Sequence, residues 1–149
     1  MITSESRFSL VLETPAASPQ EARKHFLTKL SVETDPADLA LDLQRGQTGF
    51  IIVDVRSAAA YGECHIPGAI NLPARQINEE TTASLPKEKV VITYCWGPAC
   101  NGSAKAADRL SELGFRVKEL IGGLEYWRKE GGRVEGTLRD KAPLYWQMD

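Results

Sequence analysis

The sequence predicts an open α/β fold with a mostly parallel sheet and an extra helix near the N-terminus. Short β-branched runs alternate along the chain with segments of helical periodicity, which is typical of parallel α/β sheets. The run over residues 50–56 is almost continuously apolar, as in strands that are buried on both faces. In such folds, ligands bind at the carboxyl ends of the strands.

The composition limits the class of protein. A length of 149 residues, with 42% hydrophobic and 26% charged residues, fits one globular domain. The formal net charge of −2 gives no basic surface for nucleic acid, so we expect no nucleic-acid partner. No window reaches the roughly 18 apolar residues of a membrane span, and the N-terminus lacks a secretory pattern. We therefore expect no membrane association and a cytoplasmic location.

The first 30 residues read as an N-terminal extension, and residues 31–149 as the main domain. Pro15 and Pro19 indicate an irregular start. Residues 20–30 then predict a helix with one apolar face. That face carries Ala22, Phe26, Leu27 and Leu30.

The main domain begins with a short extended piece at residues 31–33. Asp35 is a good helix cap and Pro36 a good first helical residue, so a helix is expected there, with Gly46 as its stop. The strand 50–56 follows, and its polar end is expected to emerge at Asp54.

The alternation continues to the end of the chain. We expect strands at residues 69–72, 90–94 and 116–120, and helices at 79–85, 102–113 and 124–129. The tail, residues 142–149, contains Tyr145 and Trp146, which we expect to pack back on the domain.

A cysteine stands at the junction of the strand 90–94 and the helix after it. The connecting segment reads Cys95-Trp96-Gly97-Pro98-Ala99-Cys100-Asn101-Gly102. A loop with few long side chains can turn its N–H groups inward, and with the helix N-terminus these favour a bound anion. Lowering a thiol pKa from about 8.5 to about 6 or 7 requires roughly 2 to 3.5 kcal/mol, which one or two charge-assisted hydrogen bonds supply. We expect a lowered pKa at Cys95, and Asn101 or Ser103 as the helix cap. The alternative is that Cys95 is a small buried hydrophobe.

The three cysteines, Cys64, Cys95 and Cys100, are too few for a disulfide framework, and we expect them to be reduced. Structural zinc sites usually show two close pairs of ligands, and only one pair is present here. We expect no metal and no cofactor.

Several motifs together resemble the rhodanese (sulfurtransferase) domain, in order and spacing. The resemblance covers about residues 31–132. Its motifs are Asp54-Val55-Arg56, His65-Ile66-Pro67-Gly68-Ala69-Ile70-Asn71-Leu72-Pro73, Tyr94-Cys95, Ser103-Ala104-Lys105-Ala106-Ala107, Leu113-Gly114-Phe115 and Gly122-Gly123-Leu124-Glu125-Tyr126-Trp127. The family implies a five-stranded rhodanese-like sheet with the persulfide-carrying cysteine after the fourth strand, where Cys95 stands.

The resemblance implies a sulfurtransferase that acts by nucleophilic catalysis in two half-reactions. Sulfane sulfur would pass from thiosulfate or a protein persulfide to Cys95, and then to a thiol or cyanide. The implied partners are a small anionic donor or a persulfide-bearing protein, and a thiol acceptor. The candidate substrate-binding residues are Trp96, Gly97, Ala99, Cys100, Asn101 and Gly102. Asp54, Arg56 and His65 are interpreted as structural members of the motifs.

The active-site loop departs from the family pattern. It is about two residues longer than usual, and it lacks the cation often found late in the loop, which weakens the case for thiosulfate as donor. Related phosphatases resemble a Cys-x5-Arg loop, but Asn101 stands at the arginine position, which argues against phosphoryl transfer. Ala60 stands where a glutamate could pair with Arg56, so Glu63 is a candidate partner.

Two other classes of function remain open. The chain could be a rhodanese-fold binding or regulatory module, although such modules have often lost the cysteine. It could also be a thiol redox switch, in which Cys100 acts as a resolving thiol toward Cys95. The alternative for Cys100 is that it contributes only its amide and packs its small side chain. Trp96 is a candidate contact at the rim, whereas Trp127 is expected in the core.

Overall fold

The computed structural model describes residues 7–148. The chain divides into two compact units, of which the first reaches Ser31 and the second begins at Val32. Among the described residues, no helix is both long enough and apolar enough to cross a bilayer.

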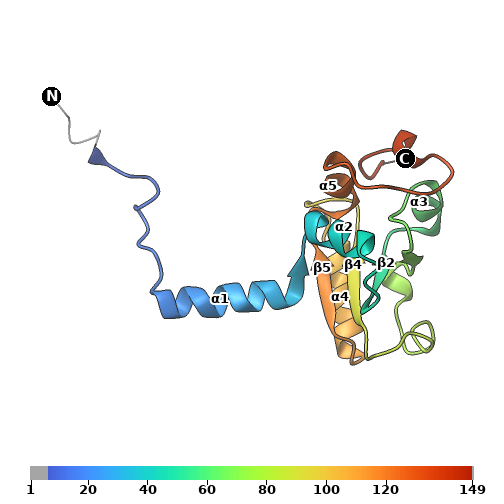
Figure 1. Cartoon of the computed structure of the whole chain (residues 1–149), viewed down its shortest axis with the longest axis horizontal. Helices are drawn as coiled ribbons and strands as arrows, with labels where there is room; N and C mark the ends of the chain where they lie inside the picture. Colours follow the sequence, from blue (N-terminus) through green and yellow to red (C-terminus); the bar gives the residue numbers. More distant parts are fainter. Residues whose placement is uncertain (1–6, 149) are drawn as a thin grey trace. The chain divides into compact units, whose positions relative to one another are not determined.

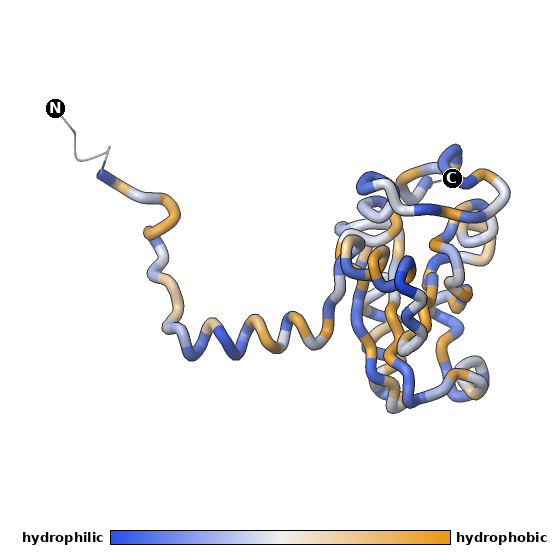
Figure 2. The backbone as a smooth tube through the Cα atoms, in the orientation of Figure 1, coloured by the Kyte–Doolittle hydropathy of each residue, from blue (hydrophilic) through white to orange (hydrophobic). Residues whose placement is uncertain are grey.

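The N-terminal unit is built around one helix, α1 (Pro19–Val32). The hydroxyl of Ser18 accepts a hydrogen bond from the amide of Glu21 at 3.2 Å and so caps the first turn. The extra helix is thus confirmed, and apolar positions recur along it in Figure 2. Phe26, Leu27 and Leu30 are exposed. The irregular stretch predicted before the helix begins within residues 1–6, outside the described residues.

The second unit contains a five-stranded sheet in the order β1-β5-β4-β2-β3, in which every pair of neighbours is parallel (Figure 1). The strands are β1 (Glu33–Thr34), β2 (Phe50–Asp54), β3 (Ile70–Asn71), β4 (Val90–Tyr94) and β5 (Val117–Leu120). The register pairs Phe50 with Val90 and Asp54 with Tyr94. The carboxyl ends of the two central strands therefore lie side by side.

Helices cover both faces of the sheet. They are α2 (Pro36–Gln44), α3 (Ala58–Glu63), α4 (Gly102–Glu112) and α5 (Gly123–Lys129), with 3-10 turns η2 (Ala74–Gln76) and η3 (Arg139–Lys141). The side chain of Asp35 accepts from the amide of Asp38 at 2.8 Å, so α2 begins as predicted. Gly46, after the helix, has a φ of 71°.

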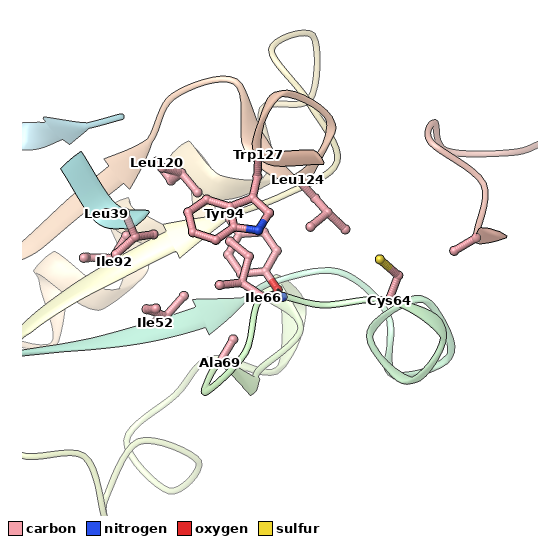
Figure 3. Packing of buried hydrophobic residues seen from close by; sticks show 11 residues of the cluster. Leu39, Ile52, Cys64, Ile66, Ala69, Ile92, Tyr94, Leu120, Leu124 and Trp127 are labelled. Atoms are coloured by element: carbon pink, nitrogen blue, oxygen red, sulfur yellow. Dashed lines mark hydrogen bonds between the residues drawn. The ribbon is translucent and has the colours of Figure 1, made fainter. Parts of the chain in front are cut away.

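Two hydrophobic clusters hold these layers together. The first joins the sheet to α2 and α5 and contains Leu39, Ile52, Ile92, Tyr94, Leu124 and Trp127 (Figure 3). The second joins the opposite face to α4 and contains Val53, Val91, Ala106 and Leu110. Adjacent residues of β2 and β4 belong to different clusters, so both central strands are buried on both faces, as the apolar runs predict.

The helix predicted over residues 79–85 is wrong, because the structure has a series of turns there. The amide of Asn78 donates to the hydroxyl of Thr81 at 3.0 Å, and the amide of Thr81 donates to the side-chain oxygen of Asn78 at 2.8 Å. The hydroxyl of Thr82 donates to the Asn78 carbonyl at 2.8 Å. Such side-chain bonds compete with a helical backbone for the same groups.

Candidate active site

Cys95 lies directly after β4, at the carboxyl end of the sheet, in the loop that leads into α4. The start of α5 holds this loop through its backbone. The amide of Leu124 donates to the carbonyl of Cys95 at 3.0 Å, and the amide of Glu125 donates to the carbonyl of Trp96 at 2.8 Å. The amides of the first turn of a helix have no partners within that helix. Here the loop carbonyls accept hydrogen bonds from these amides, and the same bonds fix the backbone of the loop.

Glycines let two helices approach the loop closely. A Cβ atom on Gly102, the first residue of α4, would lie 2.8 Å from the Cys95 sulfur. Gly123, the first residue of α5, has a φ of +60°, and a Cβ there would lie 2.8 Å from both the Cys95 carbonyl oxygen and the Gly97 nitrogen. Both helix starts thus touch the loop through positions that admit only glycine without a shift.

The Cys95 thiol is 6% exposed and has two polar neighbours. The backbone amide of Trp96 and the thiol of Cys100 lie beside its sulfur, and the amide lowers its pKa while the thiol raises it. Burial is the largest effect, and together with the Cys100 thiol it raises the pKa of Cys95 to about 12. The predicted lowering of this pKa is therefore wrong: one amide does not offset the loss of water around the sulfur. At neutral pH, Cys95 rests as a thiol.

The remaining groups of the predicted anion site are partly engaged elsewhere. The amide of Cys100 donates to the carbonyl of Gly97 at 3.0 Å. Asn101 occupies the N-cap position of α4 but makes no capping bond with its side chain. The hydroxyl of Ser103 donates to the carboxylate of Glu119 instead. The expectation that Asn101 or Ser103 caps α4 is thus wrong, and the first turn of α4 has no cap from either side chain.

Asp54 and Arg56 form a buried ion pair beneath the loop. They are 0% and 4% exposed, and the Arg56 Nη2 lies 2.8 Å from the Asp54 Oδ2. Burial lowers the pKa of Arg56, but the hydrogen bond and charge of Asp54 outweigh it and raise that pKa overall. Two expectations are corrected: Asp54 does not emerge from the sheet, and Arg56 pairs with Asp54 instead of Glu63. The two side chains can be buried together because each charge compensates the charge of the other.

This ion pair also supports the loop. The guanidinium carbon of Arg56 lies 4.5 Å from the centre of the Trp96 ring, a cation–π contact. The Arg56 side chain further donates to the carbonyls of Ala60 and Cys64. The Trp96 ring therefore packs against a guanidinium whose own hydrogen bonds and ion pair fix its position.

His65 lies in a different environment. Its Nδ1 is 2.7 Å from the carbonyl of Tyr61, its ring stacks on the Tyr61 ring at 3.9 Å, and its Nε2 is 3.8 Å from a Glu135 carboxylate oxygen. The contacts of His65 lie in α3, through Tyr61, and in the segment that follows α5, through Glu135. They fit a structural role.

Sequence reasoning missed a cavity beside the loop. Its volume is about 480 Å³, and it is lined by Trp96, Gly97, Ala99, Cys100, Glu125, Tyr145 and Trp146. Tyr145 and Trp146 come back to the domain but remain 57% and 64% exposed. The signal in the sequence is the aromatic pair Tyr145-Trp146 in the tail, which predicts packing on the domain but not a cavity. Nothing in the motif that contains Glu125 indicates that its side chain lines a cavity.

Comparisons with known proteins agree with the family resemblance of the sequence motifs. Residues 35–130 match the family model described as "Rhodanese-like domain". The chain is 36% identical over 74 residues to thiosulfate sulfurtransferase PspE of Escherichia coli, covering 49% of this chain and 69% of that protein. It is 38% identical over 79 residues to thiosulfate sulfurtransferase GlpE of Coxiella burnetii, covering 52% of this chain and 71% of that one.

The domain also occurs in larger proteins. An HTH-type transcriptional regulator of Mycobacterium tuberculosis is 34% identical over 94 residues, covering 62% of this chain but only 41% of the regulator. Among solved structures, the BH2092 protein of Bacillus halodurans is similar, with a TM-score of 0.87 and 64% identity over 88% of this chain and 96% of that one. The fold is thus shared over most of the length of both chains.

Proposed function

The chain belongs to the rhodanese-like domain family, and from this premise we propose that it is a sulfurtransferase in which Cys95 carries the transferred sulfur as a persulfide. One observation carries the proposal. Cys95 stands at the carboxyl end of the central strand β4, with the Trp96 amide on its sulfur and the start of α4 in contact with it. The names of the relatives PspE and GlpE support the same activity.

The reaction has two half-reactions. The Cys95 sulfur attacks the outer sulfur of the donor, a new sulfur–sulfur bond forms, and the donor leaves with the electron pair of its broken bond. Because Cys95 rests as a thiol, its proton is released to solvent in this step. The persulfide then gives its outer sulfur to an acceptor thiolate or to cyanide, and Cys95 returns as the leaving group. The loop amides and the uncapped start of α4 stabilise the persulfide anion.

The donor in this proposal is thiosulfate or a persulfide on another molecule, and the acceptor is a thiol or cyanide. Residues 95–101 include no cation, and the nearest guanidinium under the loop, Arg56, is neutralised by Asp54. A dianion such as thiosulfate gains most from a bidentate guanidinium. The electrostatics of the loop therefore favour a persulfide donor over thiosulfate.

A second candidate function is a thiol switch. The observation in its favour is that the sulfurs of Cys95 and Cys100 lie against the same residue, since a Cβ on Gly102 would be 2.8 Å from the first and 3.4 Å from the second. The Cys100 sulfur would attack the inner sulfur of a Cys95 persulfide, forming a disulfide and releasing hydrosulfide. The electron pair of Cys100 forms the new sulfur–sulfur bond, the hydrosulfide leaves with the pair of the broken persulfide bond, and the Cys100 proton goes to solvent, so no oxidant is required beyond the sulfur donor.

The test is the intact mass of the whole protein after incubation with thiosulfate or with a persulfidated cysteine desulfurase. We expect a gain of one sulfur atom in the wild type and in Cys100→Ser, and no gain in Cys95→Ser. Cys100→Ser is the matched control, because it alters the neighbouring thiol of the same loop. Absence of any gain with either donor contradicts the sulfurtransferase proposal. A loss of two hydrogens that requires both cysteines supports the switch instead.

A further inference from the structure

The cavity beside the Cys95 loop is built from three parts of the chain that are distant in sequence. Trp96, Gly97, Ala99 and Cys100 come from the loop, Glu125 from α5, and Tyr145 with Trp146 from the C-terminal tail. In Figure 1 the C-terminal segment lies at the same end of the domain as α5. The cavity lies near the proposed nucleophile, since Cys100 lines it and a Cβ on Gly102 would lie 3.4 Å from the Cys100 sulfur and 2.8 Å from the Cys95 sulfur.

The tail is anchored just before its two aromatic residues. The guanidinium of Arg128 donates to the carbonyls of Asp140 at 2.9 Å, Ala142 at 3.0 Å and Pro143 at 3.1 Å. Ala142 is part of the hydrophobic core. The tail therefore delivers Tyr145 and Trp146 to a fixed place beside the loop.

Charge in the cavity is already balanced. The Lys129 Nζ lies 2.7 Å from the Glu125 carboxylate and 3.5 Å from the Tyr145 hydroxyl. Of the seven described residues that line the cavity, none has a cationic side chain. An inorganic dianion would lie beside the Glu125 carboxylate, and the nearby Lys129 ammonium is already paired with that carboxylate.

The rest of the lining suits an apolar group. The rings of Trp96, Tyr145 and Trp146 surround the space, and Trp96 is held by Arg56 at 4.5 Å. Two of these rings are more than half exposed, although the tail that carries them is anchored. Small-molecule sites have volumes of roughly 300–1,000 Å³ and mostly apolar walls, and about 480 Å³ is within this range.

We propose, building on the sulfurtransferase function, that this aromatic cavity binds the organic group of a small sulfane-sulfur donor, an organic persulfide or thiosulfonate with an apolar substituent. With benzenethiosulfonate as probe, the Cys95 sulfur bonds to the outer sulfur and the bond between that sulfur and the sulfonyl sulfur breaks. Benzenesulfinate leaves with the electron pair, and the thiol proton goes to solvent. The phenyl ring occupies the cavity during this step.

The test compares benzenethiosulfonate with methanethiosulfonate, which has the same reacting group without the ring. Cyanide is the acceptor, and thiocyanate formation by the whole protein gives kcat/KM. We expect the phenyl donor to be favoured about tenfold, because the ring buries apolar area that the methyl group lacks. In Trp146→Ala, we expect the preference for the phenyl donor to fall toward unity, because the removed ring lines the cavity in which the phenyl group is proposed to lie.

Matched controls separate the cavity from general effects. Phe26→Ala removes a similarly exposed ring from α1 in the other unit and is expected to leave the preference unchanged. Benzenesulfonate, which has no outer sulfur to give, is expected to inhibit competitively and to quench tryptophan fluorescence in the wild type, and methanesulfonate is not. Tyr145→Ala provides a second variant of the same wall.

The outcomes distinguish the two proposals. If no donor gives sulfur to Cys95 in the wild type, the sulfurtransferase function fails and the cavity proposal fails with it. If both thiosulfonates react but their ratio is near unity, or is unchanged in both Trp146→Ala and Tyr145→Ala, the function stands and the cavity proposal is overturned.

Discussion

Substitution of Gly102 by alanine tests whether the start of α4 must touch the nucleophile. The added Cβ would lie 2.8 Å from the Cys95 sulfur and 3.4 Å from the Cys100 sulfur. Ordinary contact begins at 3.4 Å, so the Cys95 sulfur or the helix must move by about 0.6 Å. Overpacking of this kind costs about 1–3 kcal/mol, and alanine in place of glycine in a helix returns about 0.5–1 kcal/mol.

The net expected destabilisation for Gly102→Ala is therefore about 0–2.5 kcal/mol. For a domain of this size, that lowers Tm by up to roughly 10 °C. Activity is expected to fall more than stability, because misplacement of a reacting atom by about 1 Å can cost on the order of 100-fold. The assays are thermal unfolding by circular dichroism and the rate of persulfide formation by intact mass.

Gly62→Ala is the matched control for this substitution. Gly62 lies in α3, and a Cβ there would meet nothing within 4 Å, so we expect unchanged activity and equal or slightly higher stability. Wild-type rates of persulfide formation together with a wild-type Tm in Gly102→Ala would refute the argument, since they would mean that the added carbon is accommodated without moving the sulfur.

Two further predictions concern the charges and the thiol. Arg56→Met leaves the Asp54 carboxylate buried without its partner, and breaking a buried ion pair in this way lowers the free energy of unfolding by about 3–5 kcal/mol. Urea unfolding measures this loss. A loss below about 1 kcal/mol, as for an exposed ion pair, would contradict the buried geometry. Because burial and Cys100 raise the pKa of Cys95 to about 12, alkylation of Cys95 by iodoacetamide, located by peptide mass, is expected to be slow at neutral pH. Its rate should rise about tenfold per pH unit without a plateau below about pH 10. Cys100→Ala removes the thiol hydrogen bond and should shift this profile to lower pH, and a plateau near pH 7 in the wild type would show that the loop stabilises the thiolate.

The parts of the fold that the sequence predicts are those in which local pattern and tertiary environment agree. The apolar run 90–94 matches β4 residue for residue, because a strand buried on both faces requires apolar side chains at successive positions. Asp35 and Pro36 fix the start of α2 through their own bonds and φ angle. The turns at residues 79–85 escape the same reasoning, because Asn78 and Thr81 bind each other in a way that helical periodicity does not reveal.

The candidate site is predictable in position but only in part in its chemistry. The motifs place Cys95 at the end of the fourth strand, and the structure puts it there because β4 ends at Tyr94. The pKa of Cys95 is not readable from the loop, because it depends on how much water the fold removes from the sulfur and on the Cys100 thiol beside it. The cavity depends on contacts between Arg128 and the tail carbonyls, which join residues that are 12 to 15 positions apart.

The raised pKa and the proposed reaction are compatible because they belong to different states of the site. A protonated Cys95 in the free protein is a weak nucleophile and reacts slowly with oxidants and alkylating agents. In the proposed reaction, the outer sulfur of a Cys95 persulfide would extend beyond the Cys95 sulfur toward the start of α4, which no side chain caps and where amide donors favour an anion. If the proposal holds, the loop should stabilise the persulfide of Cys95 more than its free thiolate, as expected of a site that stabilises the product of the first half-reaction.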